Sequence, residues 1–598
     1  MCGIVAYVGD QPAAPVVFHA LGQLEYRGYD SAGIAVRTPD GTIETERTTG
    51  GVVALTSLLV RPDLQAGRTA IGHTRWATHG RVTEANAHPL SDCVGSVSIA
   101  HNGVIANADV LRRELIARGH RLAGEVDSEV IAHLVEELLT DGSSIAVALE
   151  AAVTRLEGSW AIVALDARTG NVAATAHGSP LVVSRTTEGT FVSSDVNAIS
   201  DRVDAYQVVR PSDVIEITPR GTTWWTGGDV RGEPPSVPVR WRAPAEDVGR
   251  FSDHMGREID EQPAVAARVL DAVAGGIGDG GLWRSLGLVP FDRIRRVVIL
   301  GCGTSLHAGI AIGRVFSELG HIPVTAVVAS EASSFVPEPD TLVIAISQSG
   351  ETADILRALD ELSFPGRVLL ALTNNPSSTL AREADAVVDC LAGVEIGVAA
   401  TKTFVAQVMT GVAVALSGLR GSSSVDPARA REAVAALVEI PARLDAALRG
   451  WAESVPLLVD EFADASGFLF LGRGAGVVYA AEGALKLKEL TYRWAEHHAA
   501  GELKHGPLAL VENGTPVFTV DGGDRRLDVN IAEVLARGGR VVRITDSYAD
   551  PLAPSRPAPP WGPLEAVVPL QLFARSLAIR LDRNVDKPRN LAKSVTVD

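Results

Sequence analysis

Cysteine is scarce in this chain, and its few copies lie far apart. The 598 residues include only Cys2, Cys93, Cys302 and Cys390, and these form no Cys-x-x-Cys pair and no Cys/His cluster along the sequence. The pattern argues against a disulfide framework and against a zinc site, and it fits a reducing cytoplasm. We therefore expect a cytoplasmic protein that uses neither a metal nor another cofactor.

Positive charge and long apolar segments are also lacking. The chain has 54 Lys and Arg against 72 Asp and Glu, a formal net charge of −18. This balance argues against a nucleic-acid or anionic-membrane partner. The N-terminus has no basic region followed by an apolar stretch, so no secretory signal is expected. The longest apolar segment, 404–419, is interrupted by Gln407 and is too short to span a membrane, so we predict a buried helix there.

The first third of the chain alternates short apolar strands with turns. Two stretches with helical spacing, "NADVLRRELIARG" and "DSEVIAHLVEELL", interrupt the strands, and together they predict an α+β domain over residues 2–220. The expected strands are "CGIVAYVG", "SAGIAVRT", "RTAIGHTRWA", "SVSIAHNG", "WAIVALDA", "PLVVSRT" and "DVIEITP". The next stretch is rich in glycine and proline, so we expect a linker over 221–285.

Beyond residue 290, continuous apolar strands alternate with helices, which is typical of buried parallel sheets. "VVILGCGTS" (297–305) resembles "FLFLGRGAG" (468–476), 171 positions later. "RVLLALT" (367–373) resembles "RVVRITD" (540–546), 173 positions later. The near-constant offset predicts a duplicated α/β domain, which we place at 286–427 and 455–588, with a C-terminal tail at 589–598.

Cys2 directly follows the initiator methionine. Removal of Met1 would leave Cys2 with a thiol and a free α-amino group, whose ordinary pKa values of about 8.5 and 8 make a nucleophile with its own base. A buried, inert cysteine is the alternative interpretation of the same position.

Three further segments could complete a site around Cys2. Arg75 could hold a carboxylate in its guanidinium fork, or form a surface ion pair. Asn102 and the N–H of Gly103 could form an oxyanion hole, or a tight turn. Asp127 could hold an ammonium group, or cap a helix. Together these residues describe a pocket for an amino acid whose side-chain carbonyl a thiol attacks.

Cys2-Gly3-Ile4, with "LEYRGYDSAG" (24–33), "HTRWATHG" (73–80) and "HNGVI" (101–105), closely resembles the N-terminal-nucleophile (Ntn) glutamine amidotransferase domain. The resemblance implies hydrolysis of L-glutamine by Cys2, with Asn102 and Gly103 as catalytic partners. It implies that Trp76 gates an ammonia passage, and that glutamine is bound by Arg75, Trp76, Thr78, His79 and Asp127.

The second half contains two loops that could bind an anion. After Gly301 and Gly303 the chain has Leu306 where a nicotinamide fingerprint needs its third glycine, so a dinucleotide site is not expected. "VIAISQSGETAD" (343–354) predicts a strand, a hydroxyl-rich loop and a helix start, which suit a phosphate. An ordinary serine-capped helix is the alternative.

The segment 482–498, "EGALKLKELTYRWAEHH", predicts one amphipathic helix. Its charged stripe comprises Glu482, Lys486, Glu489, Arg493 and Glu496, and its apolar side comprises Ala484, Leu487, Leu490 and Trp494. A solvated face with i,i+4 ion pairs is the simpler interpretation of the stripe.

As a set, "CGTS", "SQSGET", "EGALKLKE", "GELKHGP" and "PRNLAKSVTV" resemble the two sugar-isomerase (SIS) domains of the glutamine–fructose-6-phosphate aminotransferase family, over essentially the whole chain. The resemblance implies two parallel-sheet SIS domains and a homodimer that converts D-fructose 6-phosphate and glutamine into D-glucosamine 6-phosphate and glutamate. It implies Glu489 as the base that moves the C1/C2 proton, with Lys486 beside it, His505 as the residue that opens the sugar ring, and Lys593 as the Schiff-base lysine. The implied sugar-phosphate ligands are Ser305, Ser347, Gln348, Ser349, Thr352, Val398 and Ala592.

The sequence departs from the family pattern at two places. Ala400 replaces a serine in "GVAATK", and His497 and His498 stand where a small and an aromatic residue are usual. These changes leave open a paralogue that aminates a related ketose phosphate. A regulatory sugar-phosphate-binding protein with a relic amidotransferase half is a second alternative, which the intact set of Cys2 and its partners disfavours.

Overall fold

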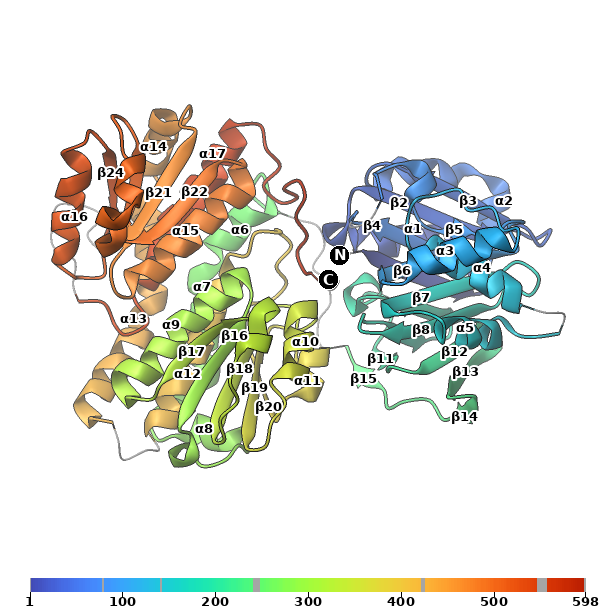
Figure 1. The fold of residues 1–598 in the computed structure, drawn as a ribbon, viewed down its shortest axis with the longest axis horizontal. Helices are drawn as coiled ribbons and strands as arrows, with labels where there is room; N and C mark the ends of the chain where they lie inside the picture. The colour runs from blue at the N-terminus through green and yellow to red at the C-terminus, as the bar shows by residue number, and fades with distance from the viewer. Residues whose placement is uncertain are drawn as a thin grey trace. The chain divides into compact units, whose positions relative to one another are not determined.

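The computed structural model describes residues 2–77, 80–139, 142–239, 248–420, 425–545 and 557–595. The chain divides into two compact units (Figure 1). Unit 1 comprises Met1–Ala245 together with Ala592–Asp598, and unit 2 comprises Glu246–Leu591.

Unit 1 is built on two stacked antiparallel sheets. The first has the order β15-β11-β9-β10-β1-β4-β2-β3, and the second has the order β14-β13-β12-β8-β7-β6-β5. The strands of the first sheet are β1 (Gly3–Gly9), β2 (Ser31–Arg37), β3 (Ile43–Thr48), β4 (Thr69–Arg75), β9 (Val182–Arg185), β10 (Gly189–Ser193), β11 (Ala205–Val208) and β15 (Val237–Pro238). Those of the second sheet are β5 (Leu90–Ser91), β6 (Val97–Ile105), β7 (Gly158–Asp166), β8 (Val172–His177), β12 (Asp213–Thr218), β13 (Gly221–Thr226) and β14 (Asp229–Arg231).

Helices cover the outer faces of both sheets, which gives unit 1 four layers (Figure 1). The inner core contains Ile4, Ile71 and Val163 from strands of the two sheets. The sheets bury an apolar side chain at nearly every inner position, so all seven predicted strands form. The helices are α1 (Ala13–Gly22), α2 (Pro62–Ala66), α3 (Ala108–Ala117), α4 (Glu129–Leu138) and α5 (Ile145–Val153).

The predicted linker at 221–285 is not a linker over most of its length. Strands β13 and β14 extend the second sheet, and Trp224 of β13 is buried against the sandwich core. Beyond the sandwich, residues 254–285 form helices whose apolar side chains, including Val269, join the core of unit 2. The glycine and proline content predicted a linker, but burial of apolar side chains stabilises a β-hairpin and several helices here.

Unit 2 contains two parallel sheets flanked by helices. The first sheet has the order β17-β16-β18-β19-β20, and the second has the order β22-β21-β23-β24. The strands are β16 (Arg296–Gly301), β17 (Val324–Val328), β18 (Thr341–Ser347), β19 (Arg367–Thr373), β20 (Ala386–Asp389), β21 (Gly467–Gly472), β22 (Trp494–Ala499), β23 (Pro516–Val520) and β24 (Arg540–Ile544). The helices are α6 (His254–Asp260), α7 (Gln262–Ile277), α8 (Gly281–Ser285), α9 (Gly303–Gly320), α10 (Ala353–Glu361), α11 (Thr379–Glu383), α12 (Lys402–Arg420), α13 (Pro427–Trp451), α14 (Ser454–Phe462), α15 (Gly476–Thr491), α16 (Arg526–Leu535) and α17 (Val567–Arg580).

The predicted duplication is present in the order of the strands. The first strand of each copy lies between the next two strands of that copy in sequence. β16 pairs with β17 and β18 in the first copy, and β21 pairs with β22 and β23 in the second. One hydrophobic core runs through both copies and includes the whole apolar segment of α12. Among the described residues, α12 is the one helix long and apolar enough to cross a membrane, and all of its apolar window is buried in the fold. This burial confirms the predicted core helix.

The helix predicted at 482–498 is only partly correct. Helix α15 ends at Thr491, because Tyr492 adopts a left-handed conformation with φ 61°, and the chain then forms β22. Arg493 and Glu496 therefore do not continue the charged stripe. Trp494, expected on the buried side, is 81% exposed, whereas Glu482, expected on the charged side, is 1% exposed.

Candidate active sites in the two units

Antiparallel pairing in unit 1 places Cys2 beside the end of β4. β1 begins at Gly3, which lies opposite Thr74, so Cys2 lies next to Arg75 and Trp76. The N–H of Trp76 donates to Cys2 Sγ at 3.3 Å. Burial raises the pKa of the Cys2 thiol, although positive charge nearby and this N–H oppose the rise. A thiol with a raised pKa needs a base before it can attack, and the α-amino group of a terminal Cys2 would be such a base.

Asn102 reaches Cys2 from β6 of the other sheet. Its Nδ2 donates to the carbonyl oxygen of Cys2 at 3.0 Å, and its Oδ1 lies 3.1 Å from Nε2 of His73. Burial lowers the pKa of His73 to about 3, so the ring is neutral, and with its proton on Nε2 it donates a hydrogen bond to Asn102 Oδ1. His73 thereby fixes which end of the Asn102 amide faces Cys2.

Gly103 must be a glycine at this position. Its φ is +133°, and an added Cβ would lie 2.0 Å from the carbonyl oxygen of Ser159. The residue therefore keeps the backbone of β6 in a conformation that a side chain would prevent. The structure brings Cys2, Asn102 and Gly103 to one end of the sandwich, as the sequence predicted for an oxyanion site.

Arg75 and Asp127, predicted to hold the two charged ends of an amino acid, are close enough to interact electrostatically. Burial lowers the pKa of Arg75, while the nearby charges of Cys2, Asp30 and Asp127 act to raise it. The guanidinium donates to the carbonyl oxygens of Gly80 and Arg81, each at 3.3 Å. The Asp127 carboxylate does not cap α4; it accepts from the N–H of Ile105 at 2.8 Å. Thr78 and His79, also predicted to bind glutamine, lie outside the described residues.

In unit 2, the hydroxyl-rich loop follows β18 and ends at the start of α10. The Ser347 and Thr352 hydroxyl oxygens are 2.9 Å apart, and Ser347 Oγ accepts from the N–H of Gly350 at 3.0 Å. Gly350 has φ +67°, and an added Cβ would lie 2.0 Å from Ser378 Oγ. The N–H of Glu351 donates to Ser349 Oγ at 3.2 Å. These contacts gather the hydroxyl groups and N–H groups of one tight turn, which suits a phosphate.

Ser305 lies in the first turn of α9, the helix that follows β16. Its Oγ accepts from Gln407 Nε2 of α12 at 3.0 Å. Because β16 and β18 are parallel neighbours, Ser305 and the loop of Ser347 lie at the same edge of the first sheet. Gln348, in that loop, accepts through its carbonyl oxygen from the N–H of Asn374 at 3.1 Å.

Helix α15 carries three charged residues that contact one another. Lys486 Nζ lies 2.7 Å from Glu489 Oε2 and 3.5 Å from Glu482 Oε1. The side chains of Lys486 and Glu482 are each 1% exposed, whereas that of Glu489 is 20% exposed. The charged stripe is thus a buried array, and the interpretation as a solvated face is wrong for these residues.

Two residues of α9 in the first copy fix Glu482 in the second. Thr304 Oγ1 donates to Glu482 Oε1 at 2.9 Å, and His307 Nδ1 lies 2.7 Å from Glu482 Oε2. Burial alone would raise the pKa of Glu482, but Lys486 and these two hydrogen bonds lower it. Burial likewise acts to lower the pKa of Lys486, and the charges of Glu489 and Glu482 outweigh it, so that pKa is raised. Glu482 and Lys486 therefore both favour their charged forms. Glu489 differs from them in being accessible to solvent.

The remaining predicted residues of the sugar site are distributed over both units. Val398 is buried, and its N–H donates to the carbonyl oxygen of Asp586 at 3.0 Å. His505 is exposed at the end of the 3₁₀ helix Ala500–His505, and no hydrogen bond or ion pair among the described residues joins it to Lys486 or Glu489. Ala592 and Lys593 belong to the tail segment that groups with unit 1. The roles implied for these residues stay predictions.

Sequence reasoning missed the residues that hold the reacting groups in place. His73 stands inside the quoted "HTRWATHG" motif, but no role was expected for it. Thr304 and His307 belong to a helix 175 or more positions away from Glu482 in sequence, so only the fold shows their contact. A histidine or threonine on a half-buried helix gives no signal of such a partner.

Comparison with family models agrees with this division of the chain. A glutamine amidotransferase domain model matches residues 73–201, and a SIS domain model matches residues 291–417 and 461–576. A sandwich with Cys2 at the start of its central strand, followed by a duplicated parallel-sheet unit, defines the class: a glutamine amidotransferase fused to two SIS domains. The predicted fold class is confirmed.

Relatives with curated names extend the likeness to the full length. Glutamine–fructose-6-phosphate aminotransferases (isomerizing) from Streptomyces coelicolor and Halobacterium salinarum are 42% and 39% identical, with 100% of each chain covered. The C-terminal domain of glucosamine-fructose-6-phosphate aminotransferase from Francisella tularensis covers 57% of this chain and 100% of its own, at 31% identity and a TM-score of 0.51. The chain belongs to the glutamine–fructose-6-phosphate aminotransferase (isomerizing) family, as the sequence motifs predicted.

Proposed function

We propose that this chain transfers the amide nitrogen of L-glutamine to D-fructose 6-phosphate and isomerises the product to D-glucosamine 6-phosphate, with release of L-glutamate. Family membership over the full length supports this reaction. The observation that carries the proposal is the presence of two separate, complementary centres. Unit 1 has a thiol beside amide donors, and unit 2 has a hydroxyl loop and a buried lysine–carboxylate array.

In unit 1, the proposed reaction is hydrolysis of the glutamine side-chain amide. Cys2 Sγ attacks the amide carbon after its proton passes to the terminal α-amine, and the same proton then leaves with ammonia. Asn102 Nδ2 and the N–H of Gly103 stabilise the oxyanion, which requires Asn102 to exchange its present contact with the Cys2 carbonyl for the substrate oxygen. Water then cleaves the γ-glutamyl thioester to release glutamate and the free thiol.

In the same unit, Arg75 and Asp127 would select glutamine by its main-chain charges. Arg75 is 3% exposed, so its attraction to a carboxylate is little screened by solvent. Asp127 would face the ammonium group. Because the two interact with each other electrostatically, a zwitterion that bridges them is a natural ligand, and an amine or an acid alone would satisfy one of them only.

In unit 2, the proposed reaction is amination at C2 followed by transfer of a proton from C1 to C2. The family resemblance implies that Lys593 forms an imine with the open-chain ketose and that ammonia then replaces the lysine at C2. The imine makes the C1 protons more acidic, so a carboxylate can remove one of them. The proton returned to C2 leaves an aldose that carries the amine.

Glu489 fits the role of this base better than Glu482 does. The oxygens of Glu482 are taken by Thr304, His307 and Lys486. Within the described part of the chain, the one ion pair of Glu489 is with Lys486, and its side chain is 20% exposed, so it can meet a substrate. Glu482 is then a positioning residue that holds Lys486, which in turn holds Glu489.

One of the departures from the family pattern, His497, lies near this array. Desolvation and the neighbouring rings of His307 and His498 lower the pKa of His497. His497 therefore stands close to His307, which bonds Glu482. This position is the reason to test other ketose phosphates alongside fructose 6-phosphate. We also infer a cytoplasmic location from the scarcity of cysteine and a homodimer from the family likeness, and sedimentation of the purified chain would test the dimer.

The proposed function is tested by identifying the product. The purified chain is incubated with glutamine labelled with ¹⁵N in the amide and with a panel of ketose phosphates, and the products are separated by mass spectrometry. We expect ¹⁵N-labelled glucosamine 6-phosphate and one glutamate per amino sugar. A different amino sugar would establish the paralogue, and sugar-phosphate binding without any turnover of glutamine would establish the regulatory alternative.

A further inference from the structure

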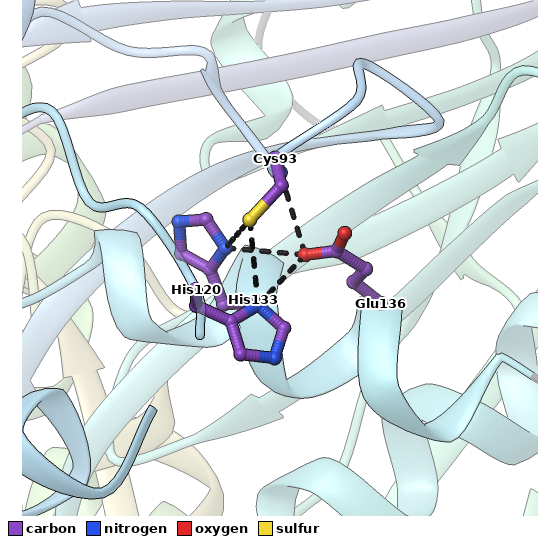
Figure 2. Close-up of side chains that lie close together, drawn as sticks. All are labelled: Cys93, His120, His133 and Glu136. Atoms are coloured by element: carbon purple, nitrogen blue, oxygen red, sulfur yellow. Dashed lines mark hydrogen bonds and ion pairs between the residues drawn. The ribbon is translucent and has the colours of Figure 1, made fainter. Parts of the chain in front are cut away.

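Four side chains with metal-binding atoms converge on the second sheet of unit 1 (Figure 2). Cys93 lies between β5 and β6, His120 follows α3, and His133 and Glu136 lie on α4. Cys93 Sγ, Nδ1 of each histidine and one oxygen of Glu136 all lie within 4.8 Å of one another. The sequence indicated no Cys/His cluster, because 27 and 40 residues separate Cys93 from the two histidines; the fold brings them together.

The distances between these atoms match the edges of a tetrahedron around zinc. Zn–N and Zn–O bonds of about 2.05 Å and a Zn–S bond of about 2.3 Å place neighbouring N and O ligands about 3.3 Å apart, and N and S ligands about 3.6 Å apart. Cys93 Sγ lies 3.5 Å from His120 Nδ1 and 3.4 Å from His133 Nδ1. Glu136 Oε2 lies 3.0 Å and 3.2 Å from the same two nitrogens.

The outer contacts of the cluster also suit a metal. His120 Nε2 lies 3.2 Å from Glu137 Oε1, a carboxylate partner of the kind that fixes the tautomer of a metal-binding histidine. With its proton on Nε2, a neutral His120 directs the lone pair of Nδ1 into the cluster. The N–H of Arg121 donates to Cys93 Sγ at 3.4 Å, which would stabilise a thiolate.

Charge and burial favour a doubly charged ion. A thiolate, a carboxylate and two neutral imidazoles carry two negative charges, which one divalent cation neutralises. The side chains of His133, His120 and Glu136 are 1%, 12% and 19% exposed, so unbalanced charge here would be costly. Sulfur and imidazole ligands exclude Mg²⁺ and Ca²⁺ and suit Zn²⁺, and four protein ligands leave no open position for catalysis.

We propose that Cys93, His120, His133 and Glu136 bind one Zn²⁺ ion, which fastens α4 to the loop before β6. This metal site is structural. Helix α4 begins two residues after Asp127, and β6 carries Asn102 and Gly103. The ion would therefore connect the helix that follows Asp127 to the loop that leads into β6. Three separate segments of the chain would be held by one ion, at Cys93, at His120 and on α4.

The first test measures the metal in the full-length chain. The protein is equilibrated with micromolar zinc, dialysed, and analysed by inductively coupled plasma mass spectrometry. We expect one zinc per chain in the unaltered protein and a loss of at least about tenfold in zinc content in Cys93→Ala and His120→Gln, since each removes a ligand. The matched controls Cys302→Ala and His19→Gln, which change residues of the same types elsewhere, should keep the metal. Absence of zinc in the unaltered protein, or equal zinc in the variants and controls, would overturn the site.

Cobalt replacement identifies the ligands without depending on the stability of a variant. The zinc-free full chain is loaded with Co²⁺, and its absorption spectrum is recorded. A tetrahedral site with one thiolate gives intense visible d–d bands and a sulfur-to-cobalt charge-transfer band, and the latter should vanish in Cys93→Ser. Weak bands typical of octahedral cobalt, or a charge-transfer band that survives in Cys93→Ser, would contradict the ligand set.

Amide hydrogen exchange tests the structural role. Chelation of the metal should speed exchange in α4 and in residues 92–96, because their shared anchor is lost. Exchange in α9 of unit 2 should stay unchanged and serves as the internal control. Equal exchange in α4 with and without metal would show that the ion does not fasten this helix.

Discussion

Buried titratable groups favour neutral forms in unit 1 and charged forms in unit 2. In unit 1 the thiol of Cys2 has a raised pKa and the imidazole of His73 has a pKa lowered to about 3, so both groups favour their neutral forms. In unit 2 the pKa of Lys486 is raised and that of Glu482 is lowered, so both favour their charged forms. Burial disfavours charge in all four groups.

The difference comes from the partners. His73 is bonded to an amide and a carbonyl oxygen, which cannot compensate a positive charge, whereas Lys486 lies between two carboxylates. Neutral forms suit a thiol that gives its proton to a base only when it attacks the substrate. A charged array suits a carboxylate that must be ionised to remove a proton. The proposed reactions of the two units fit these two environments.

Cys2→Ala should have the largest effect and should distinguish the function of unit 1 from that of unit 2 most clearly. Without the thiol, we expect glutamine-dependent synthesis to fall by about 10³-fold or more, while fructose 6-phosphate still binds to unit 2. Rates of glutamate release and sugar-phosphate titration by calorimetry measure the two effects. The mechanism also requires loss of Met1, so an active protein whose intact mass retains methionine would refute the terminal amine as base.

Lys486→Met tests the charged array of unit 2. The substitution leaves Glu482 and Glu489 without their common cation, so we expect a loss of about 3 kcal/mol in stability and about 10²-fold in amino-sugar formation. Glutamine hydrolysis in unit 1 should persist. Lys488→Met changes an exposed lysine on the same helix and should leave the unfolding temperature and the rate unaltered. Equal behaviour of the two variants would show that the array is not needed.

Ser347→Ala tests which copy of the SIS fold binds the phosphate. Loss of a hydrogen bond to a charged group costs about 1.5–3 kcal/mol, so the dissociation constant for fructose 6-phosphate should rise about tenfold or more. In the second copy the equivalent turn carries Asp524, which pairs with Arg526 at 2.6 Å and leaves no hydroxyl group for an anion. Asp524→Asn should leave the affinity unchanged, and a tighter complex in that variant would assign the phosphate to the second copy.

The pH dependence of stability should differ in sign between the units. His73 has a lowered pKa, so its contribution is complete above about pH 6.5 and is lost as the pH falls toward 3, on the order of 1 kcal/mol per unit. Lys486 has a raised pKa, so its contribution is complete below its unfolded-state value and is lost only as the pH rises beyond it. Chemical unfolding resolved by amide exchange should show unit 1 weakening between pH 6.5 and 5. His73→Gln should flatten that slope, and the exposed control His19→Gln should not; identical slopes in all three proteins would contradict the argument.

The sequence predicts the framework of this chain well, because apolar periodicity and the repeated strand motifs report burial directly. The prediction from sequence is wrong where tertiary contacts determine the secondary structure. The amphipathic spacing of 482–498 continues past Thr491, but Tyr492 ends the helix and pairing with β21 makes the remainder a strand. The Gly- and Pro-rich stretch from 221 hides a hairpin that an existing sheet edge stabilises.

The chemistry was predictable to the extent that it lies in short motifs. Cys2, Asn102 and Gly103 can be found by residue type, and the structure brings them together. The contact of His307 with Glu482 and the cluster of Cys93 with two histidines join segments that no local pattern relates. Such partners can be identified only after the fold is known.

The central claim is that Glu489 of unit 2 moves the sugar proton independently of glutamine hydrolysis at Cys2. It is tested most directly by incubating the unaltered chain, Cys2→Ala and Glu489→Gln with fructose 6-phosphate in heavy water and following deuterium at C1 by nuclear magnetic resonance. We predict equal incorporation by the unaltered chain and Cys2→Ala, and at least about 10²-fold slower incorporation by Glu489→Gln, which still hydrolyses glutamine. Deuterium that enters C1 at the unaltered rate in Glu489→Gln would contradict the account.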